Sequence, residues 1–395
     1  MKISRIVFFA LIAVLLAAGS VGIYERLVFG HRLTAYGSYA TWGLWVAAYI
    51  YFIGLSAGAF LFSSLIYVFG VKRLARIGKL SLYTALTTLI MALVVVWLDI
   101  GHMERTWEFL VRPNFTSMMN NMIWMYTAYF IILLGEFTLV AKPTMVGLNS
   151  LAKVGLSQTR LLYALGLVGV PLATLFHGGV GALFAVIGAR PYWFSALFPV
   201  LFLSGALLSG GALLTFLVAY FWPNKNQEHT TLVHILGRLV LLMLFFFVLF
   251  EWSEFSIPWW SGLSGALGVH TESVMLVLAG PFWWVFWIVH ILAGVIVPMV
   301  LLVGWPHNVK VVGLAGLLVA LTFIGVRLNS VIPGAVTVQL RGLEEAFQHP
   351  RLTFYYFPAL HEWLVVAFAV ALGAILLHIG ASRFGIFKDI GGLEK

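Results

Sequence analysis

The stretch that decides the fold is WGLWVAAYIYFIGLSAGAFLFSSLIYVF, which runs from Trp42 to Phe69 and contains no charged residue. A helix of about 20 apolar residues crosses the hydrocarbon layer of a bilayer. Inside that layer the backbone must satisfy its own hydrogen bonds, which leaves helices and closed barrels as the spanning structures. A barrel strand alternates polar and apolar side chains, whereas this stretch is apolar on all sides. It therefore predicts a transmembrane helix.

Similar apolar stretches recur along the whole chain. Residues 191–224 hold no charged residue, and residues 273–309 hold none when histidine is counted as neutral. The predicted fold class is an all-α integral membrane protein with ten transmembrane helices. The helices are expected over residues 6–28, 41–69, 80–100, 118–140, 160–187, 194–221, 232–252, 275–303, 310–328 and 359–381.

Composition and charge agree with this fold class. Of the 395 residues, 62% are hydrophobic and 9% are charged, against about 25% charged in a soluble domain. The net charge of +9 does not indicate nucleic-acid binding here, because most Lys and Arg residues fall on one side of the membrane if the N-terminus is inside. This predicts a multi-pass protein of the cytoplasmic (inner) membrane with both termini in the cytoplasm. We interpret residues 6–28 as a helix or signal anchor, not a cleaved signal peptide.

An internal repeat organises the predicted helices. Leu55-Ser-Ala-Gly-Ala-Phe-Leu61 matches Leu208-Ser-Gly-Gly-Ala-Leu-Leu214 at five of seven positions, and two further matches follow in order at offsets of 159 and 160 residues. The later of these pairs Met122–Tyr126 with Phe282–Phe286. Two tandem four-helix bundles with the same orientation are expected, flanked by one helix at each end. The predicted units of this 1 + 4 + 4 + 1 plan are residues 1–40, 41–190, 191–330 and 331–395.

Polar residues gather at the predicted outer ends of the helices. Asp99 and His102 are three residues apart, a spacing that can place both on one helical face. The residues Arg112-Pro-Asn-Phe-Thr-Ser117 follow, and Asn121 then opens the next helix. Because burying an ionisable group in a membrane segment is unfavourable in free energy, such a group is a functional candidate. Three deeper groups are candidates for a proton path: Glu136, His177 and Arg238. The alternative for Glu136 is an ordinary interfacial acid.

The redox groups that this chain can hold are limited by its composition. It has no cysteine, so it cannot ligate an iron–sulfur cluster in the usual way. A membrane haem of the b type needs two histidines that face each other from different helices. His177 and His290 form the only plausible pair, and they do not occupy equivalent repeat positions. We expect no haem in this chain.

Several of these motifs resemble the NrfD/PsrC family of quinone-interacting membrane subunits. The resemblance covers essentially the whole chain. It rests on Trp42-Gly-Leu-Trp45, Gly54-Leu-Ser-Ala-Gly58, Asp99-Ile-Gly101, Arg112-Pro-Asn-Phe-Thr-Ser117, Trp124 and Tyr126. Arg327-x-Asn329 and Tyr356-Phe-Pro-Ala-Leu-His-Glu362 resemble the ten-helix branch of the family, which includes DsrP of the DsrMKJOP complex of sulfur metabolism.

The resemblance implies a haem-free subunit of an anaerobic respiratory complex that binds menaquinone or a related quinone in the first bundle. Asp99, His102 and Tyr126 are the implied catalytic residues: Tyr126 holds a quinone oxygen, and either His102 or Asp99 accepts the proton. Position 49 departs from the family, because relatives can have a histidine where this chain has a tyrosine. The implied quinone-binding residues are Tyr49, Asn114, Ser117, Asn121 and Trp124.

The implied partners are a ferredoxin-like iron–sulfur subunit on the outer face, similar to DsrO, and further membrane and cytochrome subunits. Two other functions stay open. A secondary transporter can be built on a parallel repeat, with Pro171, Pro281 and Pro298 supplying helix breaks. A structural anchor with a vestigial quinone site is the other alternative.

Overall fold

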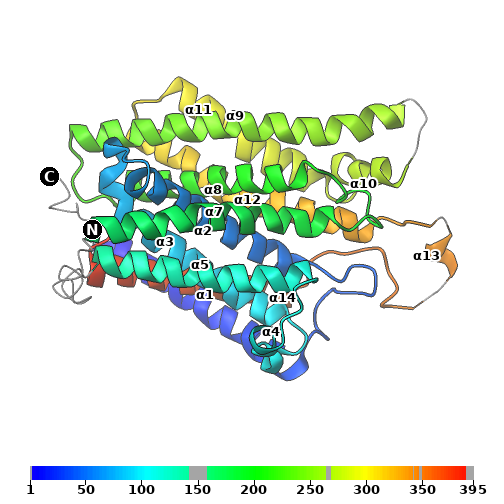
Figure 1. Cartoon of the computed structure of the whole chain (residues 1–395). Coiled ribbons are helices and arrows are strands. Elements are labelled where there is room, and N and C mark those ends of the chain that lie inside the picture. Colours follow the sequence, from blue (N-terminus) through cyan, green and yellow to red (C-terminus); the bar gives the residue numbers. More distant parts are fainter. Residues whose placement is uncertain (1, 142–157, 264–267, 341, 347–348, 388–395) are drawn as a thin grey trace.

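The structure is a computed structural model that describes residues 2–141, 158–263, 268–340, 342–346 and 349–387. In this part of the chain, ten helices are long and apolar enough to cross a membrane, which confirms the predicted number. They form one bundle of roughly aligned helices (Figure 1). The elements that contain them are α1 (Lys2–Phe29), α2 (Leu44–Tyr67), η1 (Lys72–Ile77) with α3 (Gly78–Asp99), α5 (Met118–Ala141), α7 (Gln158–Ala185), α8 (Phe198–Phe221), α9 (Gln227–Leu263), η3 (Val285–Ile296) with α11 (Val297–Gly304), α12 (Val309–Val336), and α14 (Leu360–Ile379) with η4 (Gly380–Phe384).

Short helices mark one end of the bundle. The elements η2 (Met103–Arg105) and α4 (Glu108–Val111) join α3 to α5, α10 (Val269–Leu278) follows α9, and α13 (Leu343–Ala346) precedes α14. The labelled helices α4, α10 and α13 lie at the opposite end from the N-terminus (Figure 1). We call this the outer end, after the predicted orientation.

The prediction of one continuous helix over residues 275–303 is wrong for its first part. Helix α10 ends at Leu278, and the spanning segment begins only at Val285. Gly280 and Pro281 lie in the break, where proline has no amide proton to continue a helical ladder. Val285–Ile296 then forms a π-helix. Other differences are extensions: α9 and α12 run to Leu263 and Val336, beyond the predicted ends at residues 252 and 328.

Helix α2 occupies the centre of the bundle and packs against α3, α7, α8 and α12. Helix α5 packs against α3 and α7, while α8, α9 and η3 each pack against α12 on the other side. The first and last spanning helices, α1 and α14, pack together, and α14 also contacts α3. The division into two repeated four-helix units stays a prediction.

The two copies of the repeated glycine motif meet where α2 crosses α8. A Cβ atom on Gly58 would lie 2.0 Å from the carbonyl oxygen of Ala206 and 2.9 Å from Cα of Gly210. Small residues at such a crossing let two helix backbones approach closely, which is how helices associate within a membrane. The motif therefore has a packing role in this chain.

This crossing gives a first testable prediction. Gly58→Ala places a methyl group against backbone atoms that cannot rotate away, so we expect it to destabilise the protein by about 1–3 kcal/mol. The measurement is the free energy of unfolding, or the apparent Tm, of the purified chain in detergent. Gly178→Ala in α7 is the matched control, since no atom lies within 4 Å of its added Cβ. An equal Tm for both variants would contradict the prediction.

Candidate functional site

A pair of tyrosines joins α2 to α5 inside the bundle. Tyr126 is buried and Tyr49 is half-buried. Their hydroxyl groups are hydrogen-bonded to each other, and their rings meet edge to face with centroids 6.0 Å apart. Each hydroxyl has one proton. When one hydroxyl donates to the other, the accepting hydroxyl keeps its own proton, so the pair can donate one hydrogen bond to a bound oxygen atom.

Aromatic side chains pack next to Tyr126, and a buried histidine lies on the far side of one of them. The Phe176 ring lies 5.4 Å from the ring of Tyr126 and 4.6 Å from that of Tyr129. His177 follows on α7 and is completely buried. Its imidazole lies against Gly54 of α2, where an added Cβ would be 3.3 Å from Cε1. Neither ring nitrogen of His177 has a hydrogen-bond partner among the described residues.

Asp99 lies in a different polar cluster from the tyrosine pair. Its Oδ1 accepts a hydrogen bond of 2.9 Å from the hydroxyl of Tyr36, in the segment between α1 and α2. The buried Arg26 guanidinium donates to the carbonyl oxygens of Leu98 and Ile100 on either side. Burial, followed by the charge of Asp99, holds the pKa of Tyr36 well above its usual value. The Tyr36 hydroxyl therefore keeps its proton, and Asp99 acts here as an anchor for the segment.

His102 does not share a helical face with Asp99, contrary to the sequence prediction. Helix α3 ends at Asp99, and Ile100 has an extended backbone with φ −66° and ψ 130°. The turn that follows leaves His102 in solvent, where its Nδ1 lies 3.0 Å from Oε1 of Glu104. The structure thus does not bring Asp99, His102 and Tyr126 together in one catalytic group.

The polar residues predicted to bind quinone before α5 mainly fold their own loop. The Oδ1 atom of Asn114 accepts from the amide and hydroxyl of Thr116, and Ser117 Oγ accepts from the amide of Asn120. Asn121 donates to the carbonyl of Phe115. Trp124 is 40% exposed on the surface of α5.

The three predicted proton-path residues do not form one chain. Glu136 is buried near the inner end of α5, and its Oε1 lies 3.6 Å from the position of a Cβ added to Gly166. His177 lies beside the tyrosine pair, as described above. Arg238 is exposed on α9. Arg238 thus lies apart from the two buried groups, and a proton path through these residues stays a prediction.

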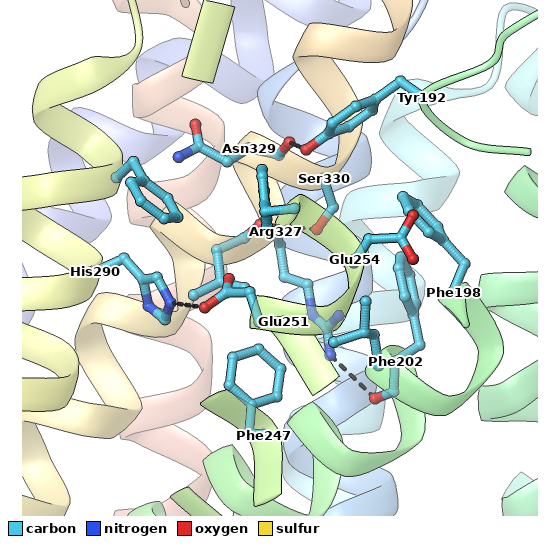
Figure 2. Close-up of a pocket in the computed structure, with 14 residues that line it drawn as sticks. Tyr192, Phe198, Phe202, Phe247, Glu251, Glu254, His290, Arg327, Asn329 and Ser330 are labelled. Atoms are coloured by element: carbon cyan, nitrogen blue, oxygen red, sulfur yellow. Dashed lines mark hydrogen bonds and ion pairs between the residues drawn. The ribbon is translucent and has the colours of Figure 1, made fainter. Parts of the chain in front are cut away.

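A second cluster, to which the sequence assigned no role, comes together in the structure. Glu251 of α9, His290 of η3 and Arg327 of α12 line a pocket with several phenylalanines (Figure 2). His290 Nε2 lies 2.7 Å from Glu251 Oε2, and both residues are buried. The available signal was an ionisable residue inside each of three apolar helices. Sequence spacing could not show that the three converge.

The fold and these sites define a class: a multi-pass integral membrane protein with buried polar clusters in an aromatic-rich helical bundle. A family model described as "Polysulphide reductase, NrfD" matches residues 33–339, and the chain belongs to this family.

Relatives extend the similarity to nearly the full length. A selenate reductase subunit of Mesobacillus selenatarsenatis is 34% identical, over 96% of this chain and 94% of the relative. The Hdr-like menaquinol oxidoreductase integral membrane subunit of Archaeoglobus fulgidus is 27% identical, over 97% and 94%. The menaquinone reductase integral membrane subunit of Nitratidesulfovibrio vulgaris is 24% identical, over 98% and 93%.

Proposed function

We propose that this chain is the quinone-binding membrane subunit of a respiratory oxidoreductase complex in the cytoplasmic membrane. One relative is named as a menaquinol oxidoreductase subunit and another as a menaquinone reductase subunit, which favours a redox role over a transporter. The observation that carries the proposal is the Tyr49–Tyr126 hydroxyl pair inside the predicted first bundle. It offers one hydrogen-bond donor between aromatic walls, the combination that a quinone headgroup needs.

The chemistry at this site must move protons together with electrons. A quinol that is oxidised releases two electrons and two protons, and quinone reduction is the reverse. The Tyr49–Tyr126 pair would orient one quinone oxygen by donating to it. His177 is the ionisable side chain next to the pair, separated from Tyr126 by the ring of Phe176. We propose that His177, rather than Asp99 or His102, receives a proton from the quinol, because Asp99 is hydrogen-bonded to Tyr36 in another cluster and His102 lies in solvent.

Electrons would pass to a docked partner at the outer end. The segment from η2 to α5 presents a mixed apolar and basic surface there, with Trp107 58%, Val111 62% and Phe115 69% exposed next to Arg112. Apolar side chains rimmed by charge are typical of protein interaction sites. We propose that a ferredoxin-like iron–sulfur subunit similar to DsrO docks on this surface. The sulfur or selenium chemistry and any cytochrome subunits would belong to the rest of the complex.

Binding of a quinone analogue tests the proposal directly. The full chain in lipid nanodiscs is titrated with a fluorescent hydroxyquinoline N-oxide, whose emission is quenched on entering a quinone site. We expect saturable quenching at one molecule per chain, reversed by added menaquinone. Quenching that rises linearly without saturation, or that menaquinone does not reverse, would contradict a quinone site in this chain.

A further inference from the structure

The pocket of the second bundle encloses an unusual set of charges (Figure 2). Helix α9 contributes Glu251 and Glu254, η3 contributes His290, and α12 contributes Arg327. The residues that α8 contributes are apolar: Phe198, Leu201 and Phe202. Arg327 is 2% exposed, and a guanidinium stays protonated in proteins. The pocket thus combines one permanent positive charge, two carboxyl groups and one imidazole.

Arg327 is fixed by its surroundings. Its guanidinium carbon lies 4.5 Å from the centre of the Phe202 ring and 5.1 Å from that of Phe323. Its Nη2 donates to the carbonyl oxygen of Phe202 at 3.2 Å. A cation held between two aromatic faces is stabilised by them, but it still needs a negative counter-charge in a membrane interior.

The pocket is electrically neutral only when one of its carboxylates or its imidazole carries an added proton. With both glutamates ionised and His290 neutral, the sum with Arg327 is one negative charge. One additional proton on Glu251, Glu254 or His290 brings the sum to zero. Burying net charge in a low-dielectric region is strongly unfavourable. The hydrogen bond of 2.7 Å between Glu251 and His290 gives that proton two places on which to reside.

The pocket also has polar atoms that need water. Among the described residues, Arg327 Nε, Glu254 Oε1 and both side-chain polar atoms of Asn329 have no hydrogen-bond partner. Buried polar groups are nearly always hydrogen-bonded, and the space between these atoms takes about three water molecules. A quinone headgroup is much larger than that. The pocket therefore fits water and a proton, not a second quinone.

The outer-end side of the pocket is formed by Glu254 and by the connection before α8. Glu254 lies one helical turn beyond Glu251 along α9 and accepts a hydrogen bond of 2.7 Å from Ser195, in the connection before α8. Tyr192 of the same connection donates to the carbonyl of Asn329. The ring centroid of His270, on α10, lies 6.4 Å from the ring centroid of Tyr192. In the other direction, Phe202 separates Arg327 from His177 of the first bundle. These are the titratable groups that face the pocket from the elements packed around it.

The backbone of η3 supports a functional role. Val285–Ile296 forms a π-helix of 12 residues that carries Phe286 and His290 into the pocket. Helical segments of this type are rare and occur frequently at functional sites. The repeat offsets of 153 and 160 residues pair Tyr49 with Phe202 and Tyr126 with Phe286. The pocket is therefore the counterpart, in the second half of the chain, of the tyrosine pair in the first.

We propose that Glu251, His290 and Arg327 form a hydrated proton-binding site in the second bundle, which exchanges its proton with the outer surface through Glu254. One proton binds per chain, shared between the Glu251 carboxylate and the His290 imidazole, and Arg327 sets the charge balance. Water molecules between Arg327, Glu254 and Asn329 connect this proton to the outer end.

Infrared difference spectroscopy of the full chain in nanodiscs tests this proposal, because a protonated carboxyl has a carbonyl band that shifts in D2O. We expect the buried-carboxyl bands of the wild type to include one titrating band that is lost in Glu251→Gln, while the bands of the other buried carboxyls remain. Arg327→Gln removes the neighbouring positive charge, so the carboxyl should bind its proton about tenfold or more tightly and titrate at higher pH. Glu272→Gln, on the exposed surface of α10, is the control that should change neither.

Each result of these measurements either supports the proposed proton-binding site or overturns it. An unchanged band in folded Glu251→Gln, or an unshifted midpoint in folded Arg327→Gln, would overturn the proposal. If Glu251→Gln does not fold, as judged by circular dichroism and gel filtration, His290→Gln replaces it. Loss of the imidazole must then move the midpoint of the band, and an unmoved midpoint overturns the site. Neither readout depends on quinone binding.

Discussion

Replacing Tyr49 and Tyr126 together by phenylalanine is expected to lower quinol-linked electron transfer of the assembled complex by about 10- to 100-fold. The substitution removes the only hydroxyl protons of the pair while keeping both aromatic rings. A buried hydrogen bond to a ligand contributes about 1–3 kcal/mol, and each 1.4 kcal/mol is a factor of about ten. The measurement is the steady-state rate with a short-chain menaquinol analogue and an artificial electron acceptor.

The single variants sharpen this result. Because the two hydroxyls are hydrogen-bonded to each other, each single replacement also changes the orientation of the remaining hydroxyl. We therefore expect the rate loss of the double variant, expressed as a free energy, to differ from the sum of the losses of the two single variants. Tyr163→Phe, on an exposed face of α7, which packs against both α2 and α5, is the matched control and should keep the wild-type rate. If the double variant were as active as Tyr163→Phe, the tyrosine pair would not be part of the quinone site.

Much of this fold could be predicted from the sequence because a membrane restricts spanning segments to a few forms. All ten predicted spans have a counterpart in the described part of the chain. The error at residues 275–303 arose because hydropathy measures composition and not backbone continuity. Residues 279–284 are as apolar as a helix, but Gly280 and Pro281 end the helical hydrogen bonding there.

The candidate site was less predictable, because its contacts join residues that are distant in sequence. Tyr49 and Tyr126 were chosen by motif and do lie together, 77 residues apart. Asp99 was placed with them by the same motif resemblance, yet its partner is Tyr36, in the segment between α1 and α2. In the sequence, His290 was considered only with His177 as a possible haem pair, and nothing linked it to Glu251. Only the packing of α9 and η3 against α12 shows that they meet.

A third cluster, centred on Glu362 of α14, ties the terminal helices to the bundle. Glu362 is completely buried. Its Oε1 accepts from the amides of Ala35 and Ala359 at 3.0 and 3.2 Å, and its Oε2 accepts from the hydroxyl of Tyr356. Burial, followed by the charge of Glu362, holds the pKa of Tyr356 well above its usual value. That hydroxyl therefore stays protonated while it also accepts from the amide of Leu44, the first residue of α2.

Glu362→Ala is consequently expected to have the largest effect on stability, a loss of about 3–5 kcal/mol, because it leaves three donors on two segments without their shared acceptor. Glu362→Gln keeps one side-chain oxygen and should lose less than half as much. Glu345→Ala, at an exposed position of α13, is the control and should leave the unfolding transition unchanged. The measurement is the free energy of unfolding in mixed micelles. If alanine at position 362 were no more destabilising than glutamine, Glu362 would not be the acceptor that holds Ala35, Tyr356 and the start of α2 together.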